Sequence, residues 1–393
     1  MYRAILAAAV LVATPALAAD QAPRPVTTYK APRAADGHAS LEGVWTNASM
    51  TRLERNARYG KDLVLTEAHV ERIEGRNRKL IELGDRPTDP NAKVTDLPAD
   101  CSGGRGVDCN YNAAWTDPGS TIMRVAGQPR NGYITTPADG RVPIRKDIPV
   151  SPFGRRLPPG LSPSDNPESR ALGERCLLSF GNSSGPVMVP GLYNNTYQFV
   201  QTPDHVAIIV EMVHDARIVR LNAKHRTDGI RPWLGDSIGW WEGDTLVVET
   251  TGYHPQQTFR GASQNLKVTE RYTPVGPDRM HYGFWVEDPT VFSQPWGGEY
   301  EFSRIRGQVY EYACHEGNYG LANILSGART EERTGVKTAP TNVDQRVPQG
   351  EGEDEGRWRL SVRCGNRRWR AVVEADGTVG TQRVDVLSAQ APR

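Results

Sequence analysis

The sequence predicts a mainly β protein with an antiparallel, up-and-down, barrel-like core, long Pro/Gly-rich loops and one short helix. Between residues 197 and 314, runs rich in β-branched and aromatic residues alternate with short turns, as consecutive hairpins do. The 39 glycines and 29 prolines among 393 residues fit a loop-rich β protein better than a helical bundle. Closing the sheet into a barrel would also remove its exposed edges.

Residues 1–18 have the pattern of a signal peptide. A positive start is followed by the apolar run 4–13 and by an A-x-A cleavage signal at 16–18. The run is too short to span a bilayer and Pro15 interrupts it, which argues against the alternative, a retained anchor. We therefore expect an exported protein, periplasmic or secreted, with no membrane span after signal cleavage.

The mature chain divides by composition into four parts. After a flexible Ala/Pro/Thr-rich lead-in, the β-rich core contains a long Pro/Gly/Asp-punctuated loop; a polar linker and a C-terminal β-hairpin extension follow. The expected bounds are 19–40 for the lead-in, 41–332 for the core, 85–167 for its long loop, 333–356 for the linker and 357–393 for the extension.

The core is expected to begin with a strand at residues 41–45. Its Gly43-x-Trp45 resembles the first-strand signature of lipocalin-like barrels, in which Trp plugs the barrel floor, although the start of a strand with a core Trp explains three residues better. The short helix is predicted over 66–82, because Thr66 can cap it and Val70 and Ile73 belong to a partial apolar stripe.

Four hairpins follow, and an additional strand at 216–221 comes after the first of them. Each pairs two apolar runs across a turn of Gly, Pro, Asp or Asn residues. The pairs are 197–201 with 206–213, 238–241 with 245–251, 266–273 with 279–287, and 300–305 with 308–314.

Charge and motifs exclude several classes of function. The 47 basic and 46 acidic residues are balanced and form no basic stripe with interleaved aromatic residues, so we expect no nucleic-acid partner. No nucleotide-binding glycine loop, G-x-S-x-G or H-E-x-x-H motif is present, and we assign no cofactor.

The five cysteines are first of all disulfide candidates, because an exported protein folds in an oxidising compartment. Cys101 and Cys109 flank a flexible loop, and Cys176 and Cys314 form the second expected pair, which leaves Cys364 over. A reactive thiol or zinc thiolates are the alternative, but the chain has no C-x-x-C.

Two clusters could carry chemistry at strand ends. In the first, His214 and Asp215 lie between Glu211 and Arg217, so an imidazole beside a carboxylate could act as acid or base while Arg217 binds an anion or carbonyl. The alternative is a structural turn capped by Asp215. A divalent metal held by the ligand types of both clusters is a further alternative, without diagnostic spacing.

The second cluster follows the run that ends at Cys314. His315 and Glu316 are the second candidate acid–base pair, and Asn318 and Tyr319 are candidate substrate-binding residues after Gly317.

Glutamates late in the strands form a third group. Glu211, Glu249, Glu270 and Glu287 need partners if they point inward, whereas all four could face water. Period-two alternation places His281, Trp285 and Glu287 on one face of their strand. We list Glu211, Glu249, Trp285 and Glu287 among the expected substrate-binding residues.

Several motifs together resemble a large family of secreted, mostly uncharacterised bacterial proteins. The resemblance covers roughly residues 170–332 and implies export without assigning catalytic residues. The motifs are Glu211-Met212-x-His214-Asp215-Ala216-Arg217, Trp241-Glu242-Gly243-Asp244-Thr245-Leu246-Val247-Val248-Glu249-Thr250 and Tyr312-Ala313-Cys314-His315-Glu316-Gly317-Asn318.

The sequence thus favours a periplasmic enzyme that acts on a small organic molecule, by hydrolysis or elimination, with His214, Asp215, His315 and Glu316 as catalytic residues. One alternative is a non-catalytic barrel that binds an apolar or aromatic ligand among its many aromatic residues. Another is a structural protein of the cell envelope in which the segment 85–167 contacts a partner.

Overall fold

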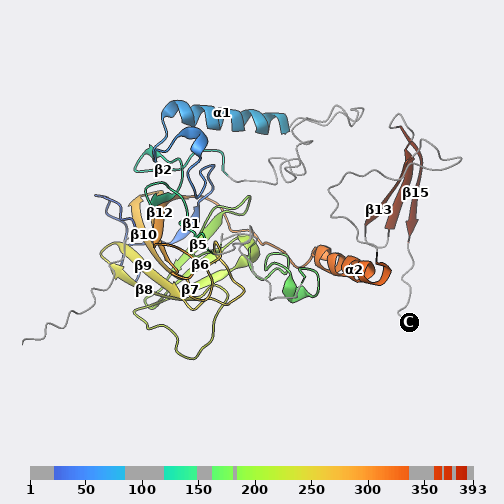
Figure 1. Cartoon of the computed structure of the whole chain (residues 1–393). Coiled ribbons are helices and arrows are strands. Elements are labelled where there is room, and N and C mark those ends of the chain that lie inside the picture. Colours follow the sequence, from blue (N-terminus) through green and yellow to red (C-terminus); the bar gives the residue numbers. More distant parts are fainter. Residues whose placement is uncertain are drawn as a thin grey trace, which may run out of the picture. The chain divides into compact units, whose positions relative to one another are not determined.

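A closed β-barrel forms the main body of the computed structural model (Figure 1). The structure describes residues 22–84, 119–147, 162–179, 184–335, 358–364, 367–373 and 378–386. In these residues nine strands close the barrel in the order β1, β5, β6, β7, β8, β9, β10, β11, β12 and back to β1, and β4 adds to the edge of β12. The predicted antiparallel barrel is therefore confirmed.

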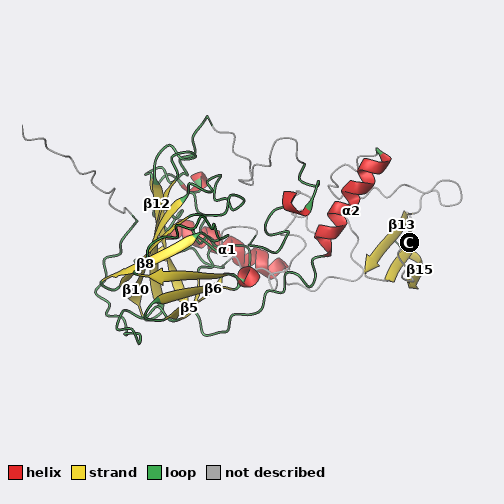
Figure 2. Cartoon of the chain, turned by 90° about the horizontal axis from the view of Figure 1, so that it is seen from below, coloured by secondary structure: helices red, strands yellow, loops and turns green. Residues whose placement is uncertain are grey.

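The barrel strands match the predicted hairpins over most of their length. Figure 2 shows strands of the barrel in yellow, among them β5, β6, β8, β10 and β12, with loops in green around them. Their bounds are β1 Gly43–Thr46, β5 Thr196–Gln201, β6 His205–Val210, β7 Ala216–Leu221, β8 Asp236–Glu242, β9 Thr245–Thr251, β10 Lys267–Gly276, β11 Arg279–Glu287 and β12 Trp296–Arg304.

Two features of the barrel differ from the expected meander. The pair β7–β8 is parallel, with Val219 opposite Ser237, because residues 222–235 cross over instead of forming a tight turn. Residues 308–314, which were expected to be the second strand of the fourth hairpin, form no strand. The first strand of that hairpin, β12, pairs instead with β1, β4 and β11. This prediction was wrong because barrel closure had already given β12 its partners.

The barrel closes where β1 meets β12. Trp45 lies opposite Arg304 in the register, and the Arg304 guanidinium carbon lies 4.2 Å from the centre of the Trp45 ring. The indole Nε1 donates to the Leu41 carbonyl oxygen at 2.9 Å, so this buried ring has no unsatisfied polar atom. The Trp predicted to belong to the core is thus buried at the strand pair that closes the barrel.

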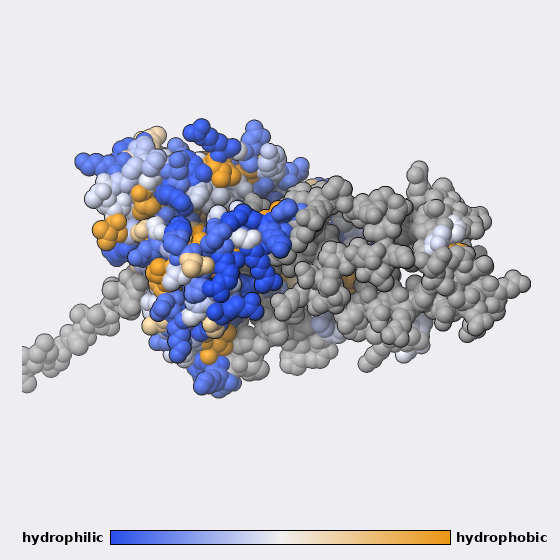
Figure 3. Space-filling model, turned by 90° about the horizontal axis from the view of Figure 1, so that it is seen from above, coloured by the Kyte–Doolittle hydropathy of each residue, from blue (hydrophilic) through white to orange (hydrophobic). Residues whose placement is uncertain are grey.

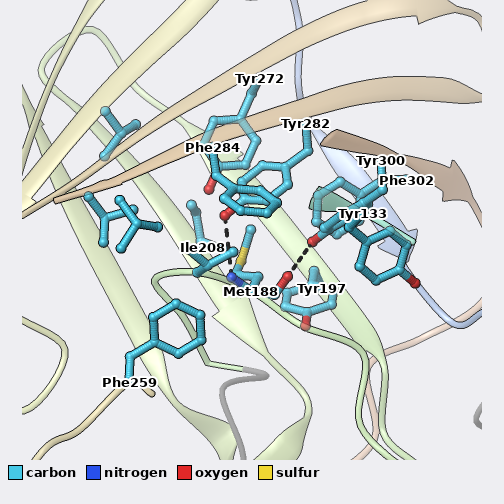
Figure 4. Packing of buried hydrophobic residues seen from close by; sticks show 14 of the residues in the cluster. Tyr133, Met188, Tyr197, Ile208, Phe259, Tyr272, Tyr282, Phe284, Tyr300 and Phe302 are labelled. Atoms are coloured by element: carbon cyan, nitrogen blue, oxygen red, sulfur yellow. Dashed lines mark hydrogen bonds between the residues drawn. The ribbon is translucent and has the colours of Figure 1, made fainter. Parts of the chain in front are cut away.

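The interior of the barrel is packed with aromatic side chains. Tyr272, Tyr282 and Tyr300 lie opposite one another on β10, β11 and β12, and their adjacent ring centres are 5.2 and 4.7 Å apart (Figure 4). Such contacts add about 0.5–1.5 kcal/mol per pair to the burial of the rings. The aromatic richness of the sequence is accounted for largely by this core.

A loop segment also enters the core. Met188 is fully buried; its amide donates to the Tyr282 hydroxyl at 3.3 Å, and its carbonyl oxygen accepts from Tyr300 at 2.7 Å (Figure 4). A chain segment inside a barrel has no ladder partner, and these two hydroxyls satisfy its backbone. The segment that begins at Ser184 is thereby fixed against the strands.

The predicted helix is α1, Glu67–Gly84. Thr66 caps it, because its Oγ1 accepts from the His69 amide at 3.2 Å, and Val70 packs with Leu65 and Ile122. On the face shown in Figure 3, hydrophilic side chains predominate and apolar ones lie scattered, which is typical of a surface in contact with water.

The segment expected to be a loose lead-in contacts the barrel at several points. Arg33 pairs with Asp244 at 2.6 Å, and His38 stacks on Trp241 with ring centres 4.8 Å apart. The Pro23 carbonyl oxygen lies where a Cβ on Gly283 would project, so this strand position requires glycine.

The remaining elements are not strands of the closed barrel. They include a second helix, α2, which the sequence analysis did not predict, and three strands where a hairpin was expected; these three pair in the order β13, β14, β15. Their bounds are β2 Arg124–Val125, β3 Gln128–Pro129, β4 Ile134–Thr136, α2 Tyr319–Thr334, β13 Trp358–Cys364, β14 Arg367–Val373 and β15 Val379–Val386.

Candidate functional site

The turn between β6 and β7 holds the first predicted cluster. Val213 and His214 adopt left-handed conformations, with φ of 61° and 45°. This region costs roughly 1–2 kcal/mol for each residue with a Cβ and is especially rare for a β-branched residue. The turn buries Val213 and exposes His214, and such strain is concentrated at functional sites.

The His214 ring is oriented by the second predicted cluster. Its Nδ1 lies 3.1 Å from the carbonyl oxygen of Tyr312. A carbonyl oxygen accepts hydrogen bonds and cannot donate them, so Nδ1 carries the proton in this contact. The other ring nitrogen, Nε2, is therefore the atom that can take up or release a proton at the exposed side of the turn.

Asp215 has a different partner. Its Oδ2 accepts a hydrogen bond from the Ser184 hydroxyl, and Ser184 is buried. Burial raises the pKa of Asp215 to about 6, while the Ser184 hydrogen bond and the charge of His214 act in the opposite direction. The expected arrangement, in which Asp215 orients His214, is thus replaced by two separate contacts that leave two titratable groups side by side.

The second cluster lies next to this turn. The disulfide Cys176–Cys314 is confirmed, and the Asn318 side chain donates to the Glu174 carbonyl oxygen at 2.8 Å. Asn318 is therefore engaged with the segment 162–179. The two clusters meet at the Tyr312 carbonyl oxygen, which contacts Nδ1 of His214.

The remaining members of the second cluster lie at the surface. His315, Glu316 and Tyr319 are exposed, and Tyr319 retains 75% of its accessible surface. His214 is exposed as well, so neither of the two imidazoles is enclosed in a cavity.

Arg217, the expected anion clamp, points into the barrel. Its guanidinium donates to both carboxylate oxygens of Glu270, at 2.6 and 3.2 Å, and to the Tyr272 hydroxyl at 2.6 Å. Arg217 and Glu270 are 2% and 0% exposed, so this ion pair belongs to the core. Tyr272 and Tyr282 also donate to Glu270, and burial raises the pKa of both tyrosines well above its usual value.

Three other expected substrate-binding residues, Glu249, Trp285 and Glu287, lie on β9 and β11 and not in the β6–β7 turn. The Glu249 carboxylate contacts Lys267 at 2.7 Å and His225 at 3.1 Å, and Glu287 lies 3.9 Å from the same lysine amine. Trp285 is buried on β11. Glu249 and Glu287 are thus partly exposed, with cationic partners, whereas Glu270 points inward.

Glu211 lies at the start of the β6–β7 turn and is buried, and its amide donates to the Thr196 carbonyl oxygen at 3.0 Å. It is therefore placed next to the candidate site. Of the expected substrate-binding residues on this segment, Glu211 stays at the turn, whereas the Arg217 side chain is bound to Glu270 in the core.

Sequence reasoning missed two residues that contribute to the site. Ser184 precedes Asp215 by 31 positions and lies in a Gly/Ser-rich segment without periodicity, so no local pattern marks it. Tyr193 stacks on Tyr312, with nearly parallel rings. Both contacts are long-range, and an isolated sequence gives no signal for them.

Metal and membrane features can be stated for the described part of the chain. There, no three or more His, Cys, Asp or Glu side chains are grouped as they would be to hold a metal ion. In the same residues, neither helix has the length and apolar character that crossing a membrane requires. Cys101 and Cys109 lie outside the described residues, and Cys364 lies in β13.

Comparison with known proteins addresses the C-terminal part. Residues 331–392 match the model of a family of unknown function, DUF6522. This segment contains β13, β14 and β15 and none of the barrel strands. A search of curated proteins finds no match.

Proposed function

We propose that this protein is an exported, periplasmic enzyme that acts on a small organic molecule by acid–base chemistry, hydrolysis or elimination. The observation that carries the proposal is the strained β6–β7 turn, which exposes His214 while Ser184 holds Asp215 beside it. A carboxyl group whose pKa burial raises to about 6 and a neighbouring exposed imidazole can divide the roles of base and acid.

Each group has a defined task in this proposal. Asp215, with a pKa of about 6, is mostly ionised at pH 7 and takes a proton from water or from the substrate carbon. His214 gives a proton to the leaving group through Nε2, the ring nitrogen that does not contact the Tyr312 carbonyl oxygen. Ser184 is 2% exposed, too buried to attack a substrate, and serves as the positioning residue of Asp215.

The test compares wild-type protein with Asp215→Asn on a panel of small esters, lactones, amides and substrates for β-elimination, with products identified by mass spectrometry. We expect kcat/KM to rise with pH through about 6 in the wild type, because protonated Asp215 is inactive as a base. Asp215→Asn should lower kcat/KM by about 10²–10⁴-fold and abolish this rise. Unchanged turnover in Asp215→Asn would contradict the proposal.

Asp204→Asn is a matched control at the other end of β6. There Asp204 and His205 also form a neighbouring pair, 3.0 Å apart, at the β5–β6 turn. The proposal assigns them no role, so this variant should keep wild-type rates. Ser184→Ala removes a hydrogen bond that lowers the pKa of Asp215, so the rise of kcat/KM should move to higher pH.

The stability of the variant separates a catalytic from a structural role. The folded-state pKa of Asp215 is raised, so the folded protein binds this proton more tightly than the unfolded chain does. The corresponding stability is present below pH 4 and is lost as pH rises through about 6. At pH 7.5 Asp215→Asn should therefore be as stable as wild type or more stable, by on the order of 1–2 kcal/mol after allowance for partial exposure.

A further inference from the structure

Two tyrosine rings lie next to the proposed acid–base pair. Tyr193 and Tyr312 are nearly parallel, with an angle of 8° between the ring planes and 6.4 Å between the ring centres. Both pack against the barrel core on one side and are only partly buried. They are thus held in position while part of their surface faces solvent.

Both rings are carried by segments that also hold the acid–base pair. Tyr312 binds His214 through its carbonyl oxygen, and the loop of Tyr193 begins at Ser184, the partner of Asp215. No helix or strand carries either ring. The same two loops therefore set the positions of the reacting groups and of the stacking surface.

Local contacts hold the Tyr193 loop in its conformation. The side chain of Asn195 accepts from the Gly191 amide at 2.7 Å and donates to the Gly191 carbonyl oxygen at 3.1 Å. Asn195 is buried, and its own carbonyl oxygen accepts from the Asn47 amide at the end of β1. These hydrogen bonds hold the loop 191–195, which carries Tyr193, against the end of β1.

We infer that Tyr193 and Tyr312 form an aromatic stacking site, called here the clamp, and that the substrate of the proposed enzyme contains a planar aromatic ring. The two tyrosine rings stack on each other, with centres within the 4.5–7 Å range of aromatic pairs. A planar substrate ring extends this stack at the part of the tyrosine pair that faces solvent. This inference rests on the proposed function, because it places the substituent of the ring at His214 and Asp215.

Binding of two probes of the same carbon skeleton tests the clamp without requiring turnover. The probes are 2-naphthol, which is planar, and decahydro-2-naphthol, which is saturated; saturation-transfer NMR and calorimetry measure their affinities for the full-length protein. We expect 2-naphthol to bind at least fivefold more tightly than the saturated probe. Equal affinity of the two probes, or no binding of 2-naphthol, would overturn the inference.

Variants locate the binding. Tyr193→Leu and Tyr312→Leu should each weaken 2-naphthol binding at least fivefold, whereas Tyr193→Phe and Tyr312→Phe keep the ring and should bind as wild type does. Tyr310→Leu is the matched control, since Tyr310 is 71% exposed on the segment that carries Tyr312. If a leucine variant fails to fold, the phenylalanine variants and the probe comparison decide, and loss of affinity in the phenylalanine variants overturns the clamp.

Asp215→Asn distinguishes the failure of this inference from the failure of the proposed function. The variant keeps both tyrosines and should still bind 2-naphthol at least fivefold more tightly than the saturated probe. Preferential binding of 2-naphthol together with unchanged turnover in Asp215→Asn would refute the acid–base proposal and leave the clamp in place. Loss of turnover without any preference for the planar probe would refute the clamp alone.

Discussion

The interior of the barrel contains a buried ion pair. Arg217 and Glu270 are almost inaccessible to water and are hydrogen-bonded to Tyr272 and Tyr282. Taking both charges out of water costs several kcal/mol per ion, which their attraction and the tyrosine hydroxyls must offset. This network places Arg217 in the core and away from the proposed reaction.

Removing one partner should be far more damaging than removing both charges. Arg217→Met leaves the Glu270 carboxylate buried without its cation and should lower the free energy of unfolding by about 3–5 kcal/mol. The double variant Arg217→Met/Glu270→Gln has no uncompensated charge and should recover at least about 1–2 kcal/mol of that loss. Urea denaturation followed by tryptophan fluorescence measures both, and a double variant no more stable than the single one would refute this account.

How well the candidate site could be predicted differs from residue to residue. His214 and Asp215 could be found because an imidazole, a carboxylate and a guanidinium fall within a few positions at a strand end. The sequence could not show that Arg217 is buried in the core and Glu249 is partly exposed. The alternation of side chains along a strand does not say which face of the sheet is covered. Tyr193 could not be found either, because its contact with Tyr312 depends on the tertiary structure.

At the scale of elements, the disulfide ties the second cluster to the segment 162–179. Cys176 and Cys314 are 138 positions apart and join the segment 162–179 to residues 306–318, which form no strand. The carbonyl of Tyr312 reaches His214 from this segment. The disulfide therefore restricts the segment whose carbonyl oxygen contacts His214.

Loss of the disulfide should affect the site more than the barrel. Cys176→Ala should lower the free energy of unfolding by about 2–4 kcal/mol, since the bond closes a long loop. Amide hydrogen exchange should accelerate at residues 306–318, whereas the amides of β10 and β11 stay protected. Cys314→Ala and the double variant should show the same loss as Cys176→Ala, because all three break one bond; losses that add up would show that the two side chains act separately.

The elements themselves were predictable where the pattern was local. The hairpins β8–β9 and β10–β11 have alternating apolar residues and compact turns, and α1 has its cap and apolar stripe, so each is specified by its own residues. The parallel pair β7–β8 and the entry of Met188 into the core have no such local cause. They follow from closing the barrel and filling it, which are properties of the whole fold.

On the scale of the whole molecule, the chain contains two compact units. One comprises residues 1–80 and 116–326, with all the barrel strands, and the other comprises residues 81–115 and 327–393. The match to DUF6522 falls on the second unit, apart from the barrel. A separate family match and a separate sheet, β13–β15, indicate that the C-terminal segment is a module of its own.

A chain that ends after Gly335 should therefore keep the barrel and its site. The closing pair Trp45–Arg304, the ion pair Arg217–Glu270 and the disulfide Cys176–Cys314 all lie before this point. We expect the truncated protein to show the barrel's thermal transition within a few degrees of the full chain and to bind 2-naphthol with unchanged affinity. Circular dichroism of the aromatic side chains and calorimetry provide these measurements.

A chain that ends after Pro295 lacks β12, which pairs with β1, β4 and β11, and should not fold. If truncation after Gly335 abolishes the transition as well, the C-terminal module is required for the stability of the barrel and the division into two units does not hold.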